Sequence, residues 1–300
     1  MALVGVWLIA TVAFGCLFLL PGEPARMALG RQASSEAVAQ FREQAGLDLP
    51  LPVQYGRYLK SLAKADFGRS LAHRRPVADL LRERAGSTFR LACLATLVVA
   101  LLSFALPLLQ RLLGLQRLLR ATHSVLAWLA ACPSYLLGVV AVLLASGMLG
   151  WAPVVFDASS PSAWILPTLV LAAYPTALVM RLFDDNLTRE LRRPYCRRAR
   201  TAGFSEARIL LAEATPNAAP VALGGLANSM AYFVTGSFFV EAVFDIPGLG
   251  RLAQESIGSK DIPVLAPLCL AFAVALTAVS IVLDIAQSVL DPKIRTERES

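Results

Sequence analysis

Long apolar runs constrain this chain more than any other feature. Runs of roughly 20 residues or more cover residues 1–20, 91–109, 124–151, 164–183, 220–243 and 263–289. A helix of about 20 apolar residues crosses a bilayer core of about 30 Å. Only 16% of the residues are charged, whereas soluble domains have about 25%. The sequence therefore predicts an all-α polytopic membrane protein with six transmembrane helices.

The distribution of basic residues predicts the topology. Short loops rich in Lys and Arg stay on the cytoplasmic side of the membrane. The segments after the second, fourth and sixth runs are basic, with Arg111, Arg117, Arg120, Arg189, Arg192, Arg193, Arg197, Arg198, Arg200, Arg208, Lys293, Arg295 and Arg298. With six spans these segments share one face, so we expect both termini in the cytoplasm. Residues 21–87 are also basic, but segments longer than about 60 residues cross largely regardless of charge.

The first run could instead be a signal peptide. It has no charged n-region and no small-residue cleavage site before Pro21, so we expect it to remain as transmembrane helix 1. The five cysteines are scattered without a CxxC pair, which indicates apolar packing. We predict no disulfide framework, metal site or cofactor.

The outer segment, residues 21–87, has the composition of a small helical cap. Ser34 and Ser35 resemble a helix start, and an amphipathic pattern runs to about Gln44. Leu49 to Pro52 is expected to be extended. Helical patterns follow over residues 53–65 and 77–84. Residues 88–300 then form a five-helix core.

The inner segment, residues 184–219, predicts a helix, a glycine turn and a second helix. Residues 188–202 have helical composition, and Gly203 is a natural C-terminal stop. Ser205 can cap the next helix, so that Glu206 lies in its first turn. This second helix is expected to run to Pro216. Such an element either lies on lipid headgroups or docks into a partner, and the residues alone favour neither.

This segment carries a recognisable pattern. Cys196-Arg-Arg-Ala199-Arg-Thr-Ala-Gly203, then nine residues before Glu213-Ala-Thr-Pro216, resembles the "EAA" loop of binding-protein-dependent ABC importer permeases. Ala199, Gly203 and Pro216 are in register, whereas the leading Glu and the Ile and Leu of that pattern are absent. Arg197 in place of the Glu is usual in the peptide/nickel branch, and Tyr195 and Arg200 fit it too.

Further stretches resemble the same branch in order along nearly the whole chain. They are Leu20-Pro-Gly-Glu-Pro24, Gly46-Leu-Asp48, Pro50-Leu-Pro-Val-Gln-Tyr55, Asp66-Phe-Gly-Arg-Ser70, Val240-Glu241-Ala-Val-Phe244, Pro247-Gly-Leu-Gly250, Asp261-Ile-Pro263 and Asp291-Pro-Lys-Ile-Arg295. The long outer segment resembles that of the first of the two permease subunits. The resemblance implies the type I ABC importer fold in a bacterial inner membrane.

The resemblance also implies partners. No GxxxxGK[ST] loop is present, so we expect no ATPase activity in this chain. Two ATP-binding subunits, a second permease subunit and an extracytoplasmic solute-binding protein are implied. The residues implied to couple to the ATPase are Arg197, Ala199, Arg200, Thr201, Ala202, Gly203 and Phe204.

The fifth run contains a candidate translocation path. Gly225, Asn228, Tyr232 and Thr235 follow helical spacing and share one face. Polar groups inside a bilayer seek a wet cavity or a partner helix. The face therefore either lines the path or packs against another helix.

Four acidic residues lie near the ends of spans. Glu241 and Asp284 are expected to snorkel or to form structural ion pairs, with a buried functional charge as the alternative. Asp184 and Asp185 are expected to face the cytoplasm or an arginine of an inner loop. Prolines in the third and fourth runs, Pro133, Pro167 and Pro175, predict kinks.

Rival classes have less support. An intramembrane enzyme needs a nucleophile with a base or a metal, yet only His73 and His123 are present and no GxSxG or HExxH occurs. A secondary transporter should show inverted repeats and charges at span centres, and a membrane scaffold would not need the Gly203 loop. Short peptides are the default substrate of the branch, with nickel chelates, glutathione and other small solutes as alternatives.

Overall fold

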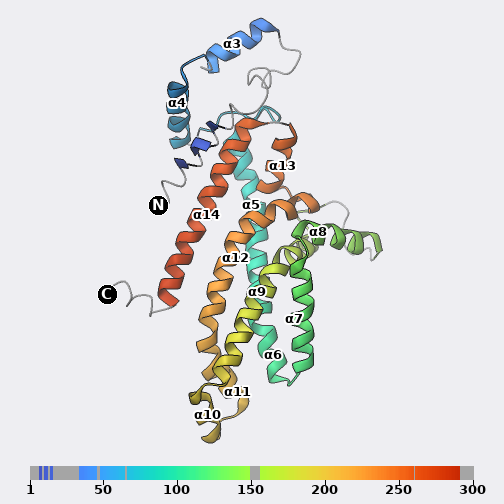
Figure 1. Cartoon of the computed structure of the whole chain (residues 1–300). Helices are drawn as coiled ribbons and strands as arrows, with labels where there is room; N and C mark the ends of the chain where they lie inside the picture. The colour runs from blue at the N-terminus through green and yellow to red at the C-terminus, as the bar shows by residue number, and fades with distance from the viewer. Residues whose placement is uncertain are drawn as a thin grey trace, which may run out of the picture. The chain divides into compact units, whose positions relative to one another are not determined.

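A computed structural model describes residues 7–8, 10–12, 14–15, 34–45, 48–64, 66–148, 156–259 and 261–290 (Figure 1). The described residues are mostly helical, and their only strand-like pairing is an isolated bridge between Arg69 and Pro76. The chain divides into two compact units. Unit 1 comprises residues 1–87 and 247–277, and unit 2 comprises residues 88–246 and 278–300.

Unit 1 contains three short amphipathic helices, α3 (Ser35–Ala45), α4 (Leu51–Ala63) and α13 (Leu249–Ser259). It also contains the start of α5 (Val77–Ala100) and most of the long apolar helix α14 (Ile262–Leu290). The helix expected from Ser35 is confirmed. Leu49 to Pro52 is not extended throughout, because α4 begins at Leu51 with Pro52 in its first turn, where a missing N–H costs nothing. Residues 77–84 are the first turns of the long helix α5.

The Pro247-Gly-Leu-Gly250 stretch leads into helix α13, which begins at Leu249. Gly250, Leu252, Ala253 and Ser256 of α13 are buried, and they recur at helical spacing. The stretch therefore anchors an amphipathic helix inside unit 1.

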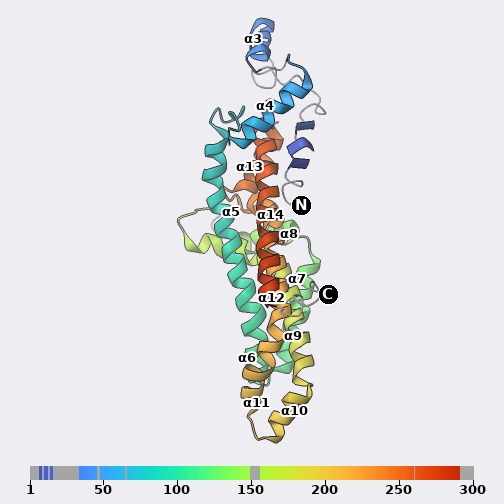
Figure 2. The same ribbon diagram turned by 90° about the vertical axis from the view of Figure 1, so that its left-hand side faces the viewer.

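Unit 2 is built on two long helices, α9 (Ile165–Leu191) and α12 (Thr215–Phe244), which pack along each other (Figures 1 and 2). The rest of α5 continues through a π-helical turn, η1 (Leu101–Ala105), into α6 (Leu106–Leu112). Two further helices, α7 (Gln116–Ala131) and α8 (Ser134–Val142), lie beside α9. The core includes Leu171, Phe183, Leu187 and Phe233, each no more than 1% exposed.

The described helices support a polytopic membrane protein. Four are long and apolar enough to cross a bilayer, at Val77–Leu112, Pro161–Leu191, Glu206–Phe244 and Pro263–Val282. The pair Gln116–Ala131 and Ser134–Ala145 would make a fifth span if it crosses as one. Most of the first predicted span, residues 1–20, lies outside the described residues, so the count of six stays a prediction.

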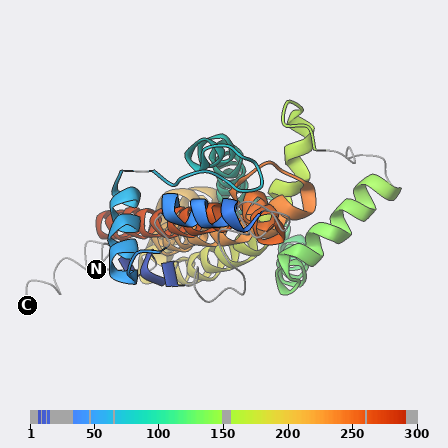
Figure 3. The same cartoon turned by 90° about the horizontal axis from the view of Figure 1, so that it is seen from above.

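The third predicted span is not one helix. It bends by 105° between α7 and α8, at Cys132 and Pro133. Figure 3, viewed from above, shows α8 running across the direction of α7. The kink predicted from Pro133 is confirmed, because proline removes a backbone donor and the residue before it favours an extended conformation. Cys132 is extended, with ψ of 134°.

Candidate functional site: the connection between α9 and α11

Residues 192–205 connect α9 to the next helices and form the α9–α11 connection. The predicted helix over residues 188–202 is wrong, because α9 ends at Leu191 and Arg193 is extended. Pro194 explains the break, since it occupies the first position of α10 (Pro194–Thr201) and disfavours a helical residue before it. The connection is therefore one short helix between two turns.

Gly203 ends α10 as the sequence predicts. Its φ is +83°, a left-handed conformation that favours glycine. The Gly203 N–H donates to the Arg200 carbonyl (3.0 Å) and the Phe204 N–H to the Ala199 carbonyl (3.1 Å). These two bonds define a Schellman motif. The turn ends α10, and Phe204 and Ser205 lead into α11.

Ser205 caps the following helix, which confirms the second sequence prediction. Its Oγ accepts a hydrogen bond from the Arg208 N–H at 3.3 Å. The short helix α11 (Glu206–Arg208) then continues through a π-helical turn, η4 (Ile209–Ala214), into α12. The expected end at Pro216 is wrong, because Pro216 lies in the first turn of α12 and is tolerated there.

One face of α10 packs into the core of unit 2, to which the helix belongs. Cys196 is fully buried and Ala199 is 8% exposed, and both belong to the core that includes Leu187, Ile209 and Leu210. Burial raises the pKa of the Cys196 thiol, so this cysteine behaves as a small apolar packer. The apolar face fixes α10 against α9 and η4.

Polar contacts hold the connection in place. Tyr195 Oη donates to Glu190 Oε2 at 2.6 Å, and partial burial together with this bond raises the pKa of the Tyr195 hydroxyl. Arg200 donates from Nε to Glu206 Oε1 (2.7 Å) and from Nη1 to the Leu191 carbonyl (3.3 Å). The hydrogen bond from Glu206 raises the pKa of Arg200. Arg200 thereby joins the two ends of the connection.

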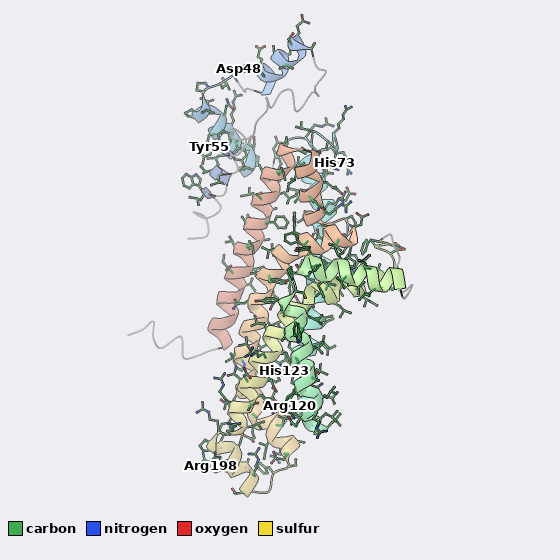
Figure 4. The ribbon with its side chains drawn as sticks, turned by 45° about the vertical axis from the view of Figure 1, so that its right-hand side comes forward. Asp48, Tyr55, His73, Arg120, His123 and Arg198 are labelled. Atoms are coloured by element: carbon green, nitrogen blue, oxygen red, sulfur yellow. The ribbon has the colours of Figure 1, made fainter. Side chains whose placement is uncertain are left out.

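The opposite face of the connection is exposed and basic. Six of the seven candidate coupling residues lie on it, namely Arg197, Arg200, Thr201, Ala202, Gly203 and Phe204, whereas Ala199 is buried. Phe204 is 37% exposed, and its ring lies 4.1 Å from the Arg208 guanidinium. Figure 4 shows Arg198 at the far end of unit 2, beyond Arg120 and His123. The surface offers cationic donors beside one aromatic ring and contains no nucleophile paired with a base.

The four candidate path residues on α12 do not share one environment. Gly225 is buried, and a Cβ there would lie 2.8 Å from Leu182 Cδ1 of α9, so this position serves close helix packing. Asn228 and Thr235 are exposed in this chain. Tyr232 is half-buried, and its ring centroid lies 5.1 Å from that of Tyr174 on α9.

The acidic pair on α9 separates into a paired residue and an exposed one. Asp184 accepts from Arg111 Nε of α6 at 2.8 Å, which confirms the expected inner-loop arginine. His123 Nε2 of α7 lies 3.3 Å from Asp184 Oδ2. The Asp185 side chain is 61% exposed and lies 3.8 Å from Arg181. This contact with His123 was not predicted, since it requires the α6–α7 turn.

Glu241 does not snorkel. It is fully buried at the end of α12 and accepts a hydrogen bond from Thr88 Oγ1 of α5 at 2.8 Å. The side chain of Asp284, on α14, lies outside the described residues. A carboxylate removed from water needs such hydrogen-bond partners. Glu241 therefore links α12 to α5 at Thr88, the first residue of unit 2.

Unit 1 brings two of the family-like stretches together. The fully buried Asp261 accepts from Ser70 Oγ (2.5 Å) and from the backbone N–H groups of Leu71 and Ala72 (both 3.1 Å). The Ser70 hydroxyl also accepts from the His73 N–H at 2.8 Å. The stretches at Asp66–Ser70 and Asp261–Pro263 are therefore joined by a buried hydrogen-bond cluster. No local sequence pattern could predict this contact. Among the described residues, no three His, Cys, Asp or Glu side chains converge as metal ligands.

Comparison with known proteins places the chain in a family. Residues 115–296 match the binding-protein-dependent transport system inner membrane component family, and residues 1–92 match the N-terminal part of such membrane components. The glutathione transport system permease protein of Salmonella typhi is 31% identical over 96% of this chain and 94% of its own length. The glutathione transport system permease protein of Escherichia coli is 30% identical over 97% of this chain and 94% of its own length. The protein therefore belongs to the binding-protein-dependent transport system inner membrane components, as an ABC importer permease of the peptide/nickel branch.

Proposed function

We propose that the α9–α11 connection is the coupling segment of an importer, onto which an ATP-binding subunit docks. The observation that carries this proposal is the exposed basic face of α10, fixed by the Schellman turn at Gly203. Its buried face and the Arg200 and Tyr195 contacts make it a rigid extension of α9. A force applied to such an element moves the helix behind it.

The remaining partners follow from the family. A second permease subunit completes the translocation path, and a second ATP-binding subunit docks on that permease subunit. An extracytoplasmic solute-binding protein delivers the solute. With the coupling segment in the cytoplasm, both termini are cytoplasmic and residues 21–87 are outside. The excess of arginines around the connection supports this orientation in the bacterial inner membrane.

The proposed substrates are short peptides, including glutathione. The two relatives named above are glutathione transport permeases, and glutathione is itself a small peptide. Nickel chelates are the alternative within the branch. Binding of glutathione, dipeptides and nickel to the cognate solute-binding protein, measured by calorimetry, tests this choice. Tight binding of nickel alone would reject the peptide assignment.

The proposed translocation path uses the exposed face of α12. Asn228 and Thr235 supply polar groups there, with the Tyr232 ring tilted against that of Tyr174 at the edge. Gly225 supports the path only indirectly, by letting α9 and α12 approach. Polar exposed positions at bilayer depth need a wet cavity or a polar partner.

Cysteine labelling tests the path. Asn228→Cys and Thr235→Cys, in a background without reactive native cysteines, should react with a membrane-impermeant thiol reagent during transport. The neighbouring Ser229→Cys is the control, because Ser229 is only 4% exposed and should stay protected. Equal protection of all three positions would contradict the proposal.

Charge reversal tests the docking. Arg198→Glu should abolish co-purification of the ATP-binding subunits, because an exposed cation that meets a partner becomes a repulsive anion. Arg120→Glu is the control, since Arg120 is exposed on α7 and lies away from the connection (Figure 4). Retained co-purification of both variants would reject the α9–α11 connection as the docking site.

A further inference from the structure

A cluster of three ionisable side chains joins three helices of unit 2 just before the α9–α11 connection. Arg111, in the last turn of α6, donates from Nε to Asp184 Oδ1 at 2.8 Å and from Nη2 to Thr188 Oγ1 at 2.6 Å. His123 Nε2, on α7, lies 3.3 Å from the other Asp184 oxygen. The side chains of Arg111 and Asp184 are each only 14% exposed.

The arrangement is more than a surface ion pair. Asp184 Oδ1 accepts a hydrogen bond from Arg111 of α6, and the buried His123 Nε2 of α7 lies 3.3 Å from Oδ2 without a hydrogen bond. The guanidinium binds two residues one helical turn apart on α9, through a rigid planar fork that the flexible ammonium of a lysine lacks. Breaking a mostly buried pair leaves a charge without compensation, so the three helices are held in one register.

The same stretch of α9 carries the contacts of the connection. Glu190 accepts from Tyr195, and the Leu191 carbonyl accepts from Arg200. Thr188 and Asp184 lie within two turns of these residues and bind the α6–α7 turn. The end of α9 therefore carries two sets of polar contacts, one to the connection and one to α6 and α7.

We propose that Arg111, Asp184 and His123 are positioning residues for energy coupling. They make the α6–α7 turn move together with α9 when the α9–α11 connection is displaced. Without them, α9 would move and the preceding span would lag behind. This inference rests on the proposed function of the connection and assigns a role to residues outside it.

The test is binding-protein-stimulated ATP hydrolysis by the complete importer reconstituted in liposomes. Asp184→Asn removes the charge with little change in size. We expect the ATP-binding subunits to remain bound, while the stimulation falls by a factor between about 2 and 30, the range for residues that modulate coupling. Asp185→Asn is the matched control, because its side chain is exposed and its ion pair lies on the surface. It should retain the stimulation of the unmodified importer.

Charge exchange separates coupling from folding. The double variant Arg111→Asp with Asp184→Arg restores an opposite pair and should recover part of the stimulation lost in Asp184→Asn. If Asp184→Asn does not assemble, Arg111→Lys decides, because it keeps the charge and loses the fork. Reduced stimulation in an intact Arg111→Lys complex supports the proposal, and unchanged stimulation overturns it.

Two outcomes bear on different statements. Equal stimulation of Asp184→Asn, Asp185→Asn and the unmodified importer would overturn the positioning role. Retention of the ATP-binding subunits by an Arg198→Glu complex would instead reject the proposed function of the α9–α11 connection. The stimulation ratio and the co-purification are measured on the same samples, so the two failures are distinguishable.

Discussion

The α9–α12 pair and the α9–α11 connection both depend on glycine, but for opposite reasons. Gly225 lies in the packed pair, where a Cβ would meet Leu182 at 2.8 Å. Gly203 lies in the connection, where a Cβ would meet nothing within 4 Å and the φ of +83° is the constraint. Gly225 makes room for a neighbouring helix, whereas Gly203 allows the left-handed backbone conformation of a turn.

The α9–α12 pair serves packing within the chain, whereas the α9–α11 connection presents a surface to other proteins. The α9–α12 interface is closed by apolar and small side chains and needs no second molecule. The connection buries one face of α10 and leaves its arginines exposed. Changes in the pair should therefore affect folding, whereas changes in the connection should affect assembly.

The largest expected effect on stability is at Gly225. Gly225→Val should lower the free energy of unfolding by about 1–3 kcal/mol, because the added methyl groups overpack the contact with Leu182. Thermal unfolding in detergent measures the change. Gly86→Val is the control, since Gly86 is also helical but has open space around its Cβ position. An equal loss in both variants would mean that helix propensity, and not packing, limits position 225.

A smaller effect is expected at Ser205. Ser205→Ala removes the side-chain cap of α11 and should cost about 1 kcal/mol. Because α11 continues into α12, faster hydrogen exchange should appear at the start of this helix. Ser205→Asp keeps a capping oxygen and should exchange like the unmodified protein. Slow exchange in Ser205→Ala would show that the packing of Ile209 and Leu210 alone holds the helix start.

The smallest effect is expected at Arg200. Its partner Glu206 is exposed, and exposed ion pairs contribute little and are screened by salt. Arg200→Lys should lower the melting temperature less than Ser205→Ala does, and the difference should shrink at high salt. A large, salt-independent loss would assign the bond to the Leu191 carbonyl a greater role than the ion pair.

Local chemistry made the turns of this protein predictable from its sequence. Gly203 and Ser205 act through bonds to residues within five positions, so the stop and the cap were both predicted. Pro133 likewise marked the bend between α7 and α8. Proline misled where context decides its effect. Pro194 broke a predicted helix, whereas Pro216 did not end one, because it falls in a first turn.

Contacts between distant residues were beyond sequence reasoning. Ser70 and Asp261 are 191 positions apart in the sequence, and a buried hydrogen bond joins them. Glu241 was expected to snorkel or to form a structural ion pair, yet it is buried and Thr88 of another helix supplies its hydrogen bond. Spacing placed Gly225, Asn228, Tyr232 and Thr235 on one face, but only the packing of α9 shows that Gly225 is buried. Periodicity gives the face of a helix and does not identify its neighbour.

The central claim is that the shape of the turn at Gly203 presents the docking surface. The decisive measurement compares Gly203→Val with Gly114→Val by co-purification of the ATP-binding subunits. Both glycines have positive φ, +83° and +69°, and both have open space, so the two variants suffer the same kind of backbone strain, about 1–2 kcal/mol. The account predicts that Gly203→Val loses the ATP-binding subunits while Gly114→Val retains them. Retention by both variants, or equal loss from both, would contradict it.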